Sequence, residues 1–298
     1  RQMLAMTKRV LFSAPILLSL AALGWGGNTI AARVAVGEIS PMMLVSTRWF
    51  MVAVMLMAIY PRRIIDALDS CKNRWPWLLA MGFGLSGFNI MFYLAAHSTS
   101  AINLGLMQST IPAIIMLVGL LIFRTPVSML QCIGLLIAMA GAAIVIAKGS
   151  IETILNMTFN HGDLIMMVGC LCYAGYTLGL SKRPAVDSIT MMGILAIFAF
   201  IASLPFTIGE ALTNTLIFPS INGWLILLYV AIAPSFLSQV WFMQGVDKIG
   251  SSKAGMFTNL VPVFSAFLGI QLLHEQMGLY HLISLAVVFT GLYIAQRR

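Results

Sequence analysis

Polar side chains recur at helical spacing within long apolar stretches of this chain. Asn89, Tyr93 and His97 follow one another at intervals of four residues, which places them on one face of a helix. In lipid a polar side chain needs a partner, so on a membrane-crossing helix it usually faces protein or water. These residue types favour reversible binding of an organic solute by hydrogen bonds and aromatic contacts. The candidate binding residues are Trp25, Asn28, Arg48, Asn89, Tyr93, Asn103, Met107, Gln108, Tyr173, Tyr176, Gln239, Trp241 and Asn259.

Several of these candidates occur at matching positions in the two halves of the chain. A shift of 150 residues places Asn89 on Gln239, and a shift of 148 residues places Trp25 on Tyr173. Taken alone, each polar residue could instead join two helices by a hydrogen bond, and each aromatic residue could face lipid. The matched set favours a central cavity to which both halves contribute.

Arg48 is the candidate under the strongest physical constraint. It lies about eight residues into an apolar stretch, and a charge at the centre of a membrane helix costs about 2.5–3.5 kcal/mol on insertion scales. A partner should offset that cost. Two interpretations stay open: Arg48 could bind a substrate carboxylate through its guanidinium fork, or it could lock helix packing through backbone carbonyls or a polar neighbour.

Two prolines interrupt the pattern at corresponding places. Pro112 and Pro262 lie 150 residues apart, each in the middle of an apolar stretch. Proline lacks a backbone N–H and can kink a helix. Paired interruptions in two halves point to a transport site, whereas a static kink is the simpler alternative. Pro112 and Pro262 are therefore the candidate kink or gating residues.

The composition excludes a water-soluble protein. Of the 298 residues, 60% are hydrophobic and only 9% are charged, against roughly 25% charged residues in a soluble domain. The net charge of +8 does not indicate nucleic-acid binding, because no basic helix or basic–aromatic cluster carries it. The four cysteines lack metal-ligand spacing, so we expect no cofactor and no metal. An H-E-x-x-H zinc motif begins at His274 but has Gly278 in place of the second histidine, so we do not expect an enzyme.

The apolar stretches predict ten membrane-spanning helices, five in each half. With the N-terminus in the cytoplasm, all Lys and Arg residues except Arg33, Arg48 and Lys148 fall on the cytoplasmic side. This bias is typical of bacterial-type inner (cytoplasmic) membrane proteins and predicts that both termini are cytoplasmic. The expected spans cover residues 13–35, 40–60, 76–97, 101–123, 127–147, 162–182, 188–209, 222–246, 250–273 and 277–296.

An odd number of spans in each half forces the two halves to insert in opposite senses. The sequence therefore predicts an all-α integral membrane protein of ten transmembrane helices in two inverted five-helix repeats. The repeats are residues 1–150 and 151–298, which together form one transmembrane domain. The expected partners are the lipid bilayer and a small organic solute, with protons as a candidate coupling ion. The protein would act as a monomer or a homodimer.

Short motifs follow one another in a fixed order along these spans. Trp25-Gly26 is followed by Asn28, and Arg48 is followed by Trp49. Longer motifs run from Phe92-Tyr93-Leu94-Ala95 through Ser100-Ala101 to Pro112, and from Gly250-Ser251-Ser252 through Pro262 to Glu275. In this order, and over nearly the whole chain, the sequence resembles the drug/metabolite transporter superfamily, specifically its ten-helix EamA-type carriers. It departs from the family where Arg124-Thr125 replaces the usual Gly-Glu after the fourth helix.

The resemblance implies a basket of helices in which the first four of each repeat line a central cavity and the fifth supports it from outside. It also implies a secondary transporter that moves small organic solutes, such as amino acids or related metabolites, by alternating access, with export as the favoured direction. The alternative is an uptake carrier driven by protons or by exchange. The acidic residues Glu38, Asp163, Glu210 and Glu275 lie at or beyond outer span ends, where we expect most of them to be solvated.

Overall fold

The computed structural model describes residues 13–99, 101–274 and 276–297. Within these ranges, ten helical stretches are long and apolar enough to cross a membrane, and each coincides with an expected span to within a few residues. Arg1, Lys8, Arg9, Ser100, Glu275 and Arg298 lie outside the described residues. The ten stretches are Ala14–Val34, Pro41–Ile59, Lys72–Ala96, Asn103–Phe123, Met129–Ile146, His161–Lys182, Ser188–Leu212, Ile221–Ile249, Ser251–Leu273 and Leu279–Gln296.

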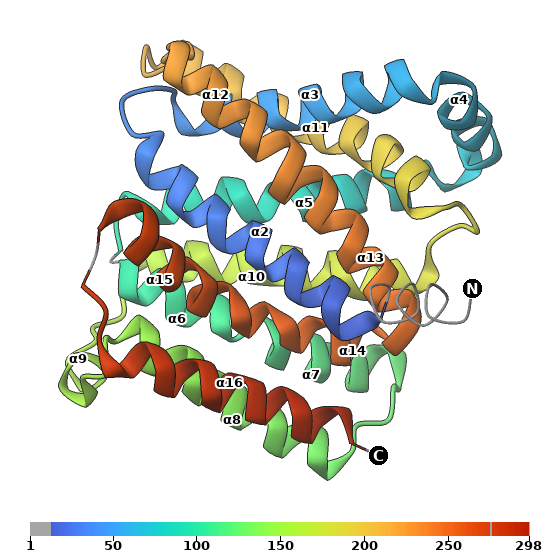
Figure 1. Ribbon diagram of the computed structural model, residues 1–298. Coiled ribbons are helices and arrows are strands. Elements are labelled where there is room, and N and C mark those ends of the chain that lie inside the picture. Colours follow the sequence, from blue (N-terminus) through green and yellow to red (C-terminus); the bar gives the residue numbers. More distant parts are fainter. Residues whose placement is uncertain (1–12, 100, 275, 298) are drawn as a thin grey trace, which may run out of the picture.

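Some spans consist of more than one helix, as Figure 1 shows. In chain order the helices are α2 (Ala14–Val34), α3 (Pro41–Ile59), α4 (Pro61–Ser70), α5 (Trp75–Ala96), α6 (Ala101–Ser109), α7 (Ile111–Phe123), α8 (Met129–Ile146), α9 (Ile151–Leu155), α10 (His161–Gly179), α11 (Ser188–Leu212), α12 (Ile221–Val230), α13 (Ser238–Ile249), α14 (Ser251–Gly255), α15 (Leu260–Leu273) and α16 (Leu279–Gln296).

The two faces of the bundle differ in charge. Helix α2 begins and α16 ends at the same face, on the right in Figure 1. We term this the basic face, and we term the other end of the bundle the opposite face. The helix ends and connecting segments that lie at the basic face contain Arg62, Arg63, Lys72, Arg74, Arg124, Lys182, Arg183, Lys248, Lys253 and Arg297.

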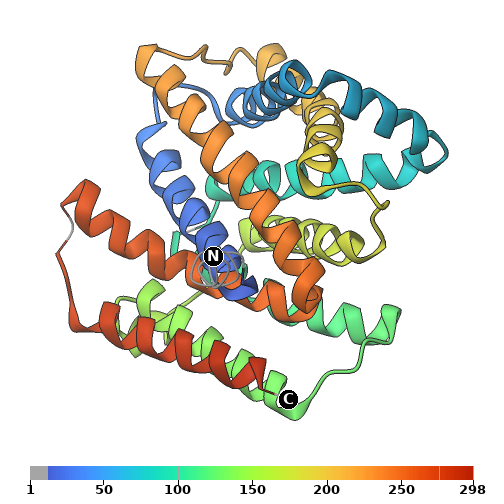
Figure 2. The same ribbon diagram turned by 45° about the vertical axis from the view of Figure 1, so that its right-hand side comes forward.

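The two repeats interlock at the centre of the bundle. Helix α5 of the first repeat packs along α10 of the second. Helix α2, which is the first-repeat equivalent of α10, packs along α13 and α15 of the second repeat. Helices α3 and α11 form another pair. Helices α8 and α16 pack along each other at one edge, as both Figure 1 and Figure 2 show. This architecture is that of two inverted five-helix repeats, and it surrounds the centre with helices from both.

Small residues allow α8 and α16 to approach closely. A Cβ atom added at Gly291 would lie 2.5 Å from both the carbonyl oxygen of Gly134 and the backbone nitrogen of Ala138. Ser284 donates a hydrogen bond of 2.7 Å to the carbonyl of Gly141 across the same interface. Close backbone approach at small residues is a main source of helix association in lipid. The pair is therefore a tightly packed support outside the centre.

The fourth and ninth spans are interrupted at matching positions. Thr110 separates α6 from α7, and the 3-10 segment Met256–Asn259 separates α14 from α15. Pro112 and Pro262 each lie in the first turn of the helix that follows, where a missing N–H is tolerated. The hydroxyl of Thr110 donates to the carbonyl of Met107 at 2.6 Å, at the point where the helix is interrupted.

The eighth span carries an interruption without a counterpart in α5. Residues Ala231–Leu237 form a π-helical turn that contains Pro234, whereas α5 is a continuous α-helix through Gly84 at the equivalent position. Such turns are rare and frequently occur at functional sites. We term this stretch the π segment.

Candidate solute-binding site

Aromatic rings from both repeats meet at the centre of the bundle. The ring of Trp25 on α2 meets those of Tyr173 on α10 and Phe242 on α13 edge to face, with centroid distances of 5.8 and 5.2 Å. The ring of Tyr173 also lies 5.5 Å from Phe88 on α5 and 5.6 Å from Tyr176. The structure thus brings three of the candidate residues into one cluster.

On the helices around these rings, buried polar atoms lack hydrogen-bond partners within the described part of the chain. Both side-chain amide atoms of Asn259 are unpaired, although the residue is fully buried. An unpaired buried polar group costs about 1–3 kcal/mol, so native proteins seldom keep several of them together. A bound solute would supply the missing partners. The unpaired atoms of this group are Asn28 Oδ1, Tyr173 Oη, Tyr176 Oη, Ser238 Oγ, Gln239 Oε1 and both amide atoms of Asn259.

The polar faces of α5 and α13, which match in sequence, are used differently. Gln239 is buried on α13 and its side chain faces that of Tyr173, although the two groups do not form a hydrogen bond of standard geometry. Its counterpart Asn89 is half-buried and donates to the carbonyl of Leu85 in its own helix at 3.1 Å. In this matched pair, Gln239 therefore presents a buried, unpaired amide oxygen, whereas the amide nitrogen of Asn89 is engaged within its own helix.

Arg48 is held on one side of its guanidinium group and left open on the other. The residue is only 3% exposed, and its Nε donates to Ser235 Oγ at 2.7 Å. The Ser235 hydroxyl in turn donates to the carbonyl of Val230 at 2.6 Å. The guanidinium carbon lies 5.6 Å from the ring centroid of Trp49, in cation–π range. Nη1 is buried and has no partner among the described residues.

The π segment anchors two candidate residues at adjacent positions. Trp25 Nε1 donates to the carbonyl of Pro234 at 3.2 Å, and Arg48 bonds to Ser235, the next residue. Because a π turn and a proline both shift backbone carbonyls away from regular helical bonding, this carbonyl can accept from another helix. The π segment therefore sets the positions of Trp25 and Arg48 relative to each other.

Asn103 lies elsewhere, in a polar network at the opposite face. Its Nδ2 donates to Asp163 Oδ2 at 2.9 Å and to the carbonyl of Thr158 at 3.1 Å. Thr99 Oγ1 donates to the same carboxylate at 2.6 Å. Asp163 is only 2% exposed, so the solvation expected for most of the acidic residues at outer span ends does not hold for this one. Donors from the start of α6 and α10 satisfy this carboxylate and allow its burial.

The remaining candidates border the cluster or lie outside it. Tyr93 is half-buried and lies within electrostatic range of Arg48. Met107 is buried in the apolar core, while Gln108 and Trp241 are half-buried. Within the described chain, no aromatic contact joins Trp241 to the central rings.

Some residues at the centre were absent from the sequence-based candidates. Phe242 completes the aromatic cluster, and Ser235 holds Arg48. The repeat offered a signal for Phe242, since a shift of 150 residues places Phe92 on it. Ser235 could not have been selected in this way, because its role depends on the π segment.

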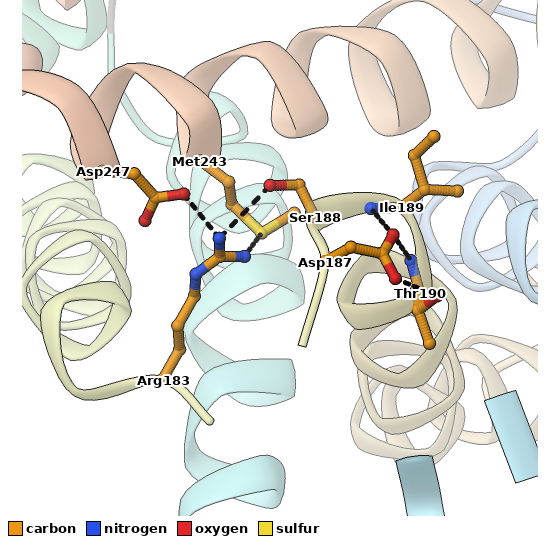
Figure 3. Close-up of polar contacts among 7 residues, drawn as sticks. All are labelled: Arg183, Asp187, Ser188, Ile189, Thr190, Met243 and Asp247. Atoms are coloured by element: carbon orange, nitrogen blue, oxygen red, sulfur yellow. Dashed lines mark hydrogen bonds and ion pairs between the residues drawn. The ribbon is translucent and has the colours of Figure 1, made fainter. Parts of the chain in front are cut away.

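The basic face is closed by a polar cluster, shown in Figure 3. Arg183, at the end of the sixth span, forms an ion pair of 2.5 Å with Asp247 of α13. Its guanidinium also donates to Ser188 Oγ at 3.3 Å and approaches the sulfur of Met243 at 3.8 Å. The side chain of Arg183 is 13% exposed and that of Asp247 is 43% exposed, so the pair is partly shielded from water. The cluster connects the end of the sixth span to α11 and α13.

Asp187 caps α11 beside this cluster. Its carboxylate accepts bonds from the backbone of Ile189 and from the backbone and hydroxyl of Thr190, as Figure 3 shows. Burial acts to raise the pKa of Asp187, but these hydrogen bonds and the charge of Arg63 outweigh it and hold the pKa below its ordinary value of 3.8. Cavities of about 400 and 370 Å³ flank segment 183–187 on its two sides.

Packing at the two faces is asymmetric. At the basic face, α14 packs against α7 and α10, and a Cβ atom added at Gly255 would lie 2.6 Å from Ile115 Cδ1. The matching contact at the opposite face would join α6 to α15, and no comparably extensive packing joins these two helices in the described structure. Among the described residues, the basic face therefore has a contact between the two repeats that its counterpart at the opposite face lacks.

Comparison with known proteins agrees with this architecture. The model of the EamA-like transporter family matches residues 12–147 and 160–296. The uncharacterized transporter YyaM of Bacillus subtilis (strain 168) is 28% identical over 277 residues, which cover 91% of this chain and 89% of that protein. An uncharacterized transporter of Archaeoglobus fulgidus is 24% identical over 284 residues, which cover 94% of this chain and 96% of that protein. A solved structure described as "Crystal structure of protein" matches with a TM-score of 0.78 at 17% identity, over 95% of this chain and 96% of that one, and shows the fold alone. The chain is a multi-pass membrane protein that belongs to the EamA-like transporter family.

Proposed function

We propose that this protein is a secondary transporter that moves small organic solutes, such as amino acids or related metabolites, across the cytoplasmic membrane by alternating access. The observation that carries the proposal is the group of unpaired buried polar atoms where the two repeats meet, on Asn28, Tyr176, Gln239 and Asn259 among others. Polar groups of a solute would complete these hydrogen bonds, and the ring of Trp25 and its neighbours would contact its apolar part.

Access to this site would alternate as the two repeats move about their shared centre. The basic face is closed here by the ion pair of Arg183 with Asp247 and by the packing of α14 on α7. The rings of Trp25 and Tyr173 contact each other, so the solute would enter as the helices that carry them separate. The matching interruptions near Pro112 and Pro262 would let half of each span tilt while the other half stays packed.

We assign the basic face to the cytoplasm, because positively charged loops stay on that side of bacterial-type membranes. Both termini would then be cytoplasmic. Within this proposal, export is the favoured direction by analogy with the family. Uptake coupled to protons or to exchange is a second candidate, because alternating access through the same site can run in either direction.

Flux in proteoliposomes with an imposed pH gradient separates the two directions. Efflux from the compartment on the basic-face side, unchanged by the gradient, supports export without proton coupling. Uptake that reverses when the gradient is reversed supports the second candidate.

A thermal-shift screen of the purified protein against a metabolite library tests the site itself. A solute at a hundred times its Kd stabilises the protein by about 2.7 kcal/mol, which is readily detected. We expect Asn259→Ala to abolish the shift, because Asn259 has two unpaired buried amide atoms. Thr290→Val is the control, since Thr290 is exposed on α16, which packs mainly along α8 at the edge of the bundle. A shift that survives Asn259→Ala and Tyr173→Phe unchanged would contradict the proposed site.

A further inference from the structure

We infer that the solute carries an anionic group, such as a carboxylate, which binds Arg48, and a planar apolar body that lies against the rings of Trp25 and Tyr173. This inference rests on the proposed function, because it assigns the chemistry of the same central site. It gives Arg48 two roles at once. The Nε side of the guanidinium group holds the helix packing, and the other side binds the solute.

The charge of Arg48 has no counter-charge in the described part of the chain. The residue is 3% exposed. The titratable side chain within electrostatic range of it is that of Tyr93, which has no carboxylate. The carboxylates within or next to the spans are engaged elsewhere. Asp163 is bound by Thr99 and Asn103 at the opposite face, and Asp247 is paired with Arg183 at the basic face.

Glu210 is also engaged at the opposite face. Its carboxylate accepts from the hydroxyl of Ser40 at 2.6 Å and from the backbone of Met42 at 2.9 Å and Met43 at 3.1 Å. The other described acidic residues lie in connecting segments or at the ends of spans. Among the residues that the structure describes, the middle of the bundle therefore holds one fixed positive charge and no fixed negative charge. A buried charge of this kind needs an ionic partner, and the solute can provide it.

The hydrogen bonds of Arg48 leave one side of the guanidinium available. Nε is committed to Ser235, whose own proton goes to the carbonyl of Val230, so this side is a fixed structural contact. Nη1 is buried and unpaired. A guanidinium whose Nε side is anchored presents its remaining N–H groups in a fixed plane, which suits a carboxylate.

The π segment, which holds Arg48, also indicates where the planar apolar part of the solute would lie. Trp25 bonds to Pro234, which precedes the Ser235 that holds Arg48, so the indole and the guanidinium are positioned by consecutive residues. The indole meets the Tyr173 ring edge to face at 5.8 Å. A planar body would replace this ring contact with two new aromatic contacts. An organic cation would meet an unpaired positive charge here and no carboxylate, so we expect the site to reject it.

The test uses three probes of nearly equal shape and different charge: benzoate, benzamide and benzamidinium. Their binding to the purified protein is measured by thermal shift and calorimetry at low ionic strength. We expect benzoate to bind about tenfold to a hundredfold more tightly than benzamide, as one charge-assisted hydrogen-bonded pair allows, and benzamidinium not to bind. This comparison needs no variant, so it holds even if changes at Arg48 prevent folding.

Two variants locate the charge preference. Arg48→Gln should bind benzoate no better than benzamide, and Arg48→Lys should keep part of the preference because it keeps the charge but loses the fork. Thr290→Val should behave as the unaltered protein. Equal binding of benzoate and benzamide, a preference for benzamidinium, or an unchanged preference in folded Arg48→Gln would overturn the inference.

Two further outcomes distinguish a failure of this inference from a failure of the proposed function. If none of the three probes binds but the metabolite library yields a solute that needs Asn259, the anion inference fails and the proposed site stands. If neither the probes nor any library compound binds, and proteoliposomes show no solute flux, both fail.

Discussion

Trp25 and Tyr173 occupy equivalent positions in the two repeats, 148 residues apart, and their rings meet edge to face at a centroid distance of 5.8 Å. Equivalent residues of an inverted repeat can contact each other only near the axis that relates the two halves. The contact therefore marks the centre of the bundle. It is surrounded by the unpaired polar atoms of Asn28 and Tyr176, which also match at a shift of 148 residues.

Removing the hydroxyl of Tyr173 should have opposite effects on the stability of the solute-free protein and on its affinity for the solute. The hydroxyl is buried and unpaired, so Tyr173→Phe should raise the free energy of unfolding of the solute-free protein by up to about 1 kcal/mol. The same change should weaken binding of any solute found in the screen by about tenfold, because a hydrogen bond is lost. Thermal unfolding and calorimetry measure the two effects. Tyr293→Phe, on the exposed side of α16, is the control and should change neither by much. Lower stability of Tyr173→Phe without solute would mean that the hydroxyl is satisfied in the solute-free protein.

Breaking the ion pair at the basic face should open that face. The Asp247 side chain is 43% exposed, so the pair contributes only about 0.3–1 kcal/mol, equivalent to a change of about twofold to fivefold in an equilibrium. We expect Asp247→Asn to increase labelling of a cysteine placed at the buried Ala254 by a membrane-impermeant maleimide by that factor. The four native cysteines are first replaced by serine or alanine. The double exchange Arg183→Asp with Asp247→Arg should restore the protection. Labelling that is the same in all three proteins would show that the pair does not hold this face closed.

Filling the interface of α8 and α16 should reduce stability. A methyl group at Gly291 would lie 2.5 Å from backbone atoms of Gly134 and Ala138, so the helices must move apart. We expect Gly291→Ala to lower the free energy of unfolding by about 1–3 kcal/mol, as overpacking does elsewhere. Gly209→Ala on α11 is the matched control, because a methyl group there meets nothing within 4 Å. Solute affinity should stay unchanged in both variants, since the interface lies outside the central site. Equal unfolding temperatures for the two variants would mean that α8 and α16 adjust without cost.

The cap of α11 should make stability depend on pH in a defined range. Hydrogen bonds and the charge of Arg63 lower the pKa of Asp187 in the folded protein below 3.8, so its carboxylate stabilises the fold at neutral pH. This contribution should be lost as the pH falls through the lowered pKa, that is, in the range below 3.8. Asp187→Ala should therefore cost about 1 kcal/mol at pH 7 and progressively less in acid. Asp187→Asn keeps a neutral cap, so its cost should be smaller at pH 7. Thermal unfolding from neutral pH to pH 3 measures all three proteins, and a cost of Asp187→Ala that is constant over this range would contradict the assignment.

The ten spans and their inverted arrangement could be predicted from the sequence alone. A membrane-crossing helix satisfies its backbone internally and needs a continuous apolar stretch, and both features depend on local sequence. The positions of interruption at Pro112 and Pro262 follow from the same local logic, because a proline removes a donor wherever it stands. The family resemblance and the duplication also depend only on the order of residues.

The tertiary structure alone decided which polar residues meet. Asn89 and Gln239 match in sequence, yet Asn89 bonds to its own helix and Gln239 faces Tyr173, because the rotation of each helix depends on how it packs. Arg48 finds Ser235 187 residues away, on a π turn that no local pattern predicts. Partners so distant along the chain are selected by packing against several helices at once, and the energy of that packing is not a property of any single segment.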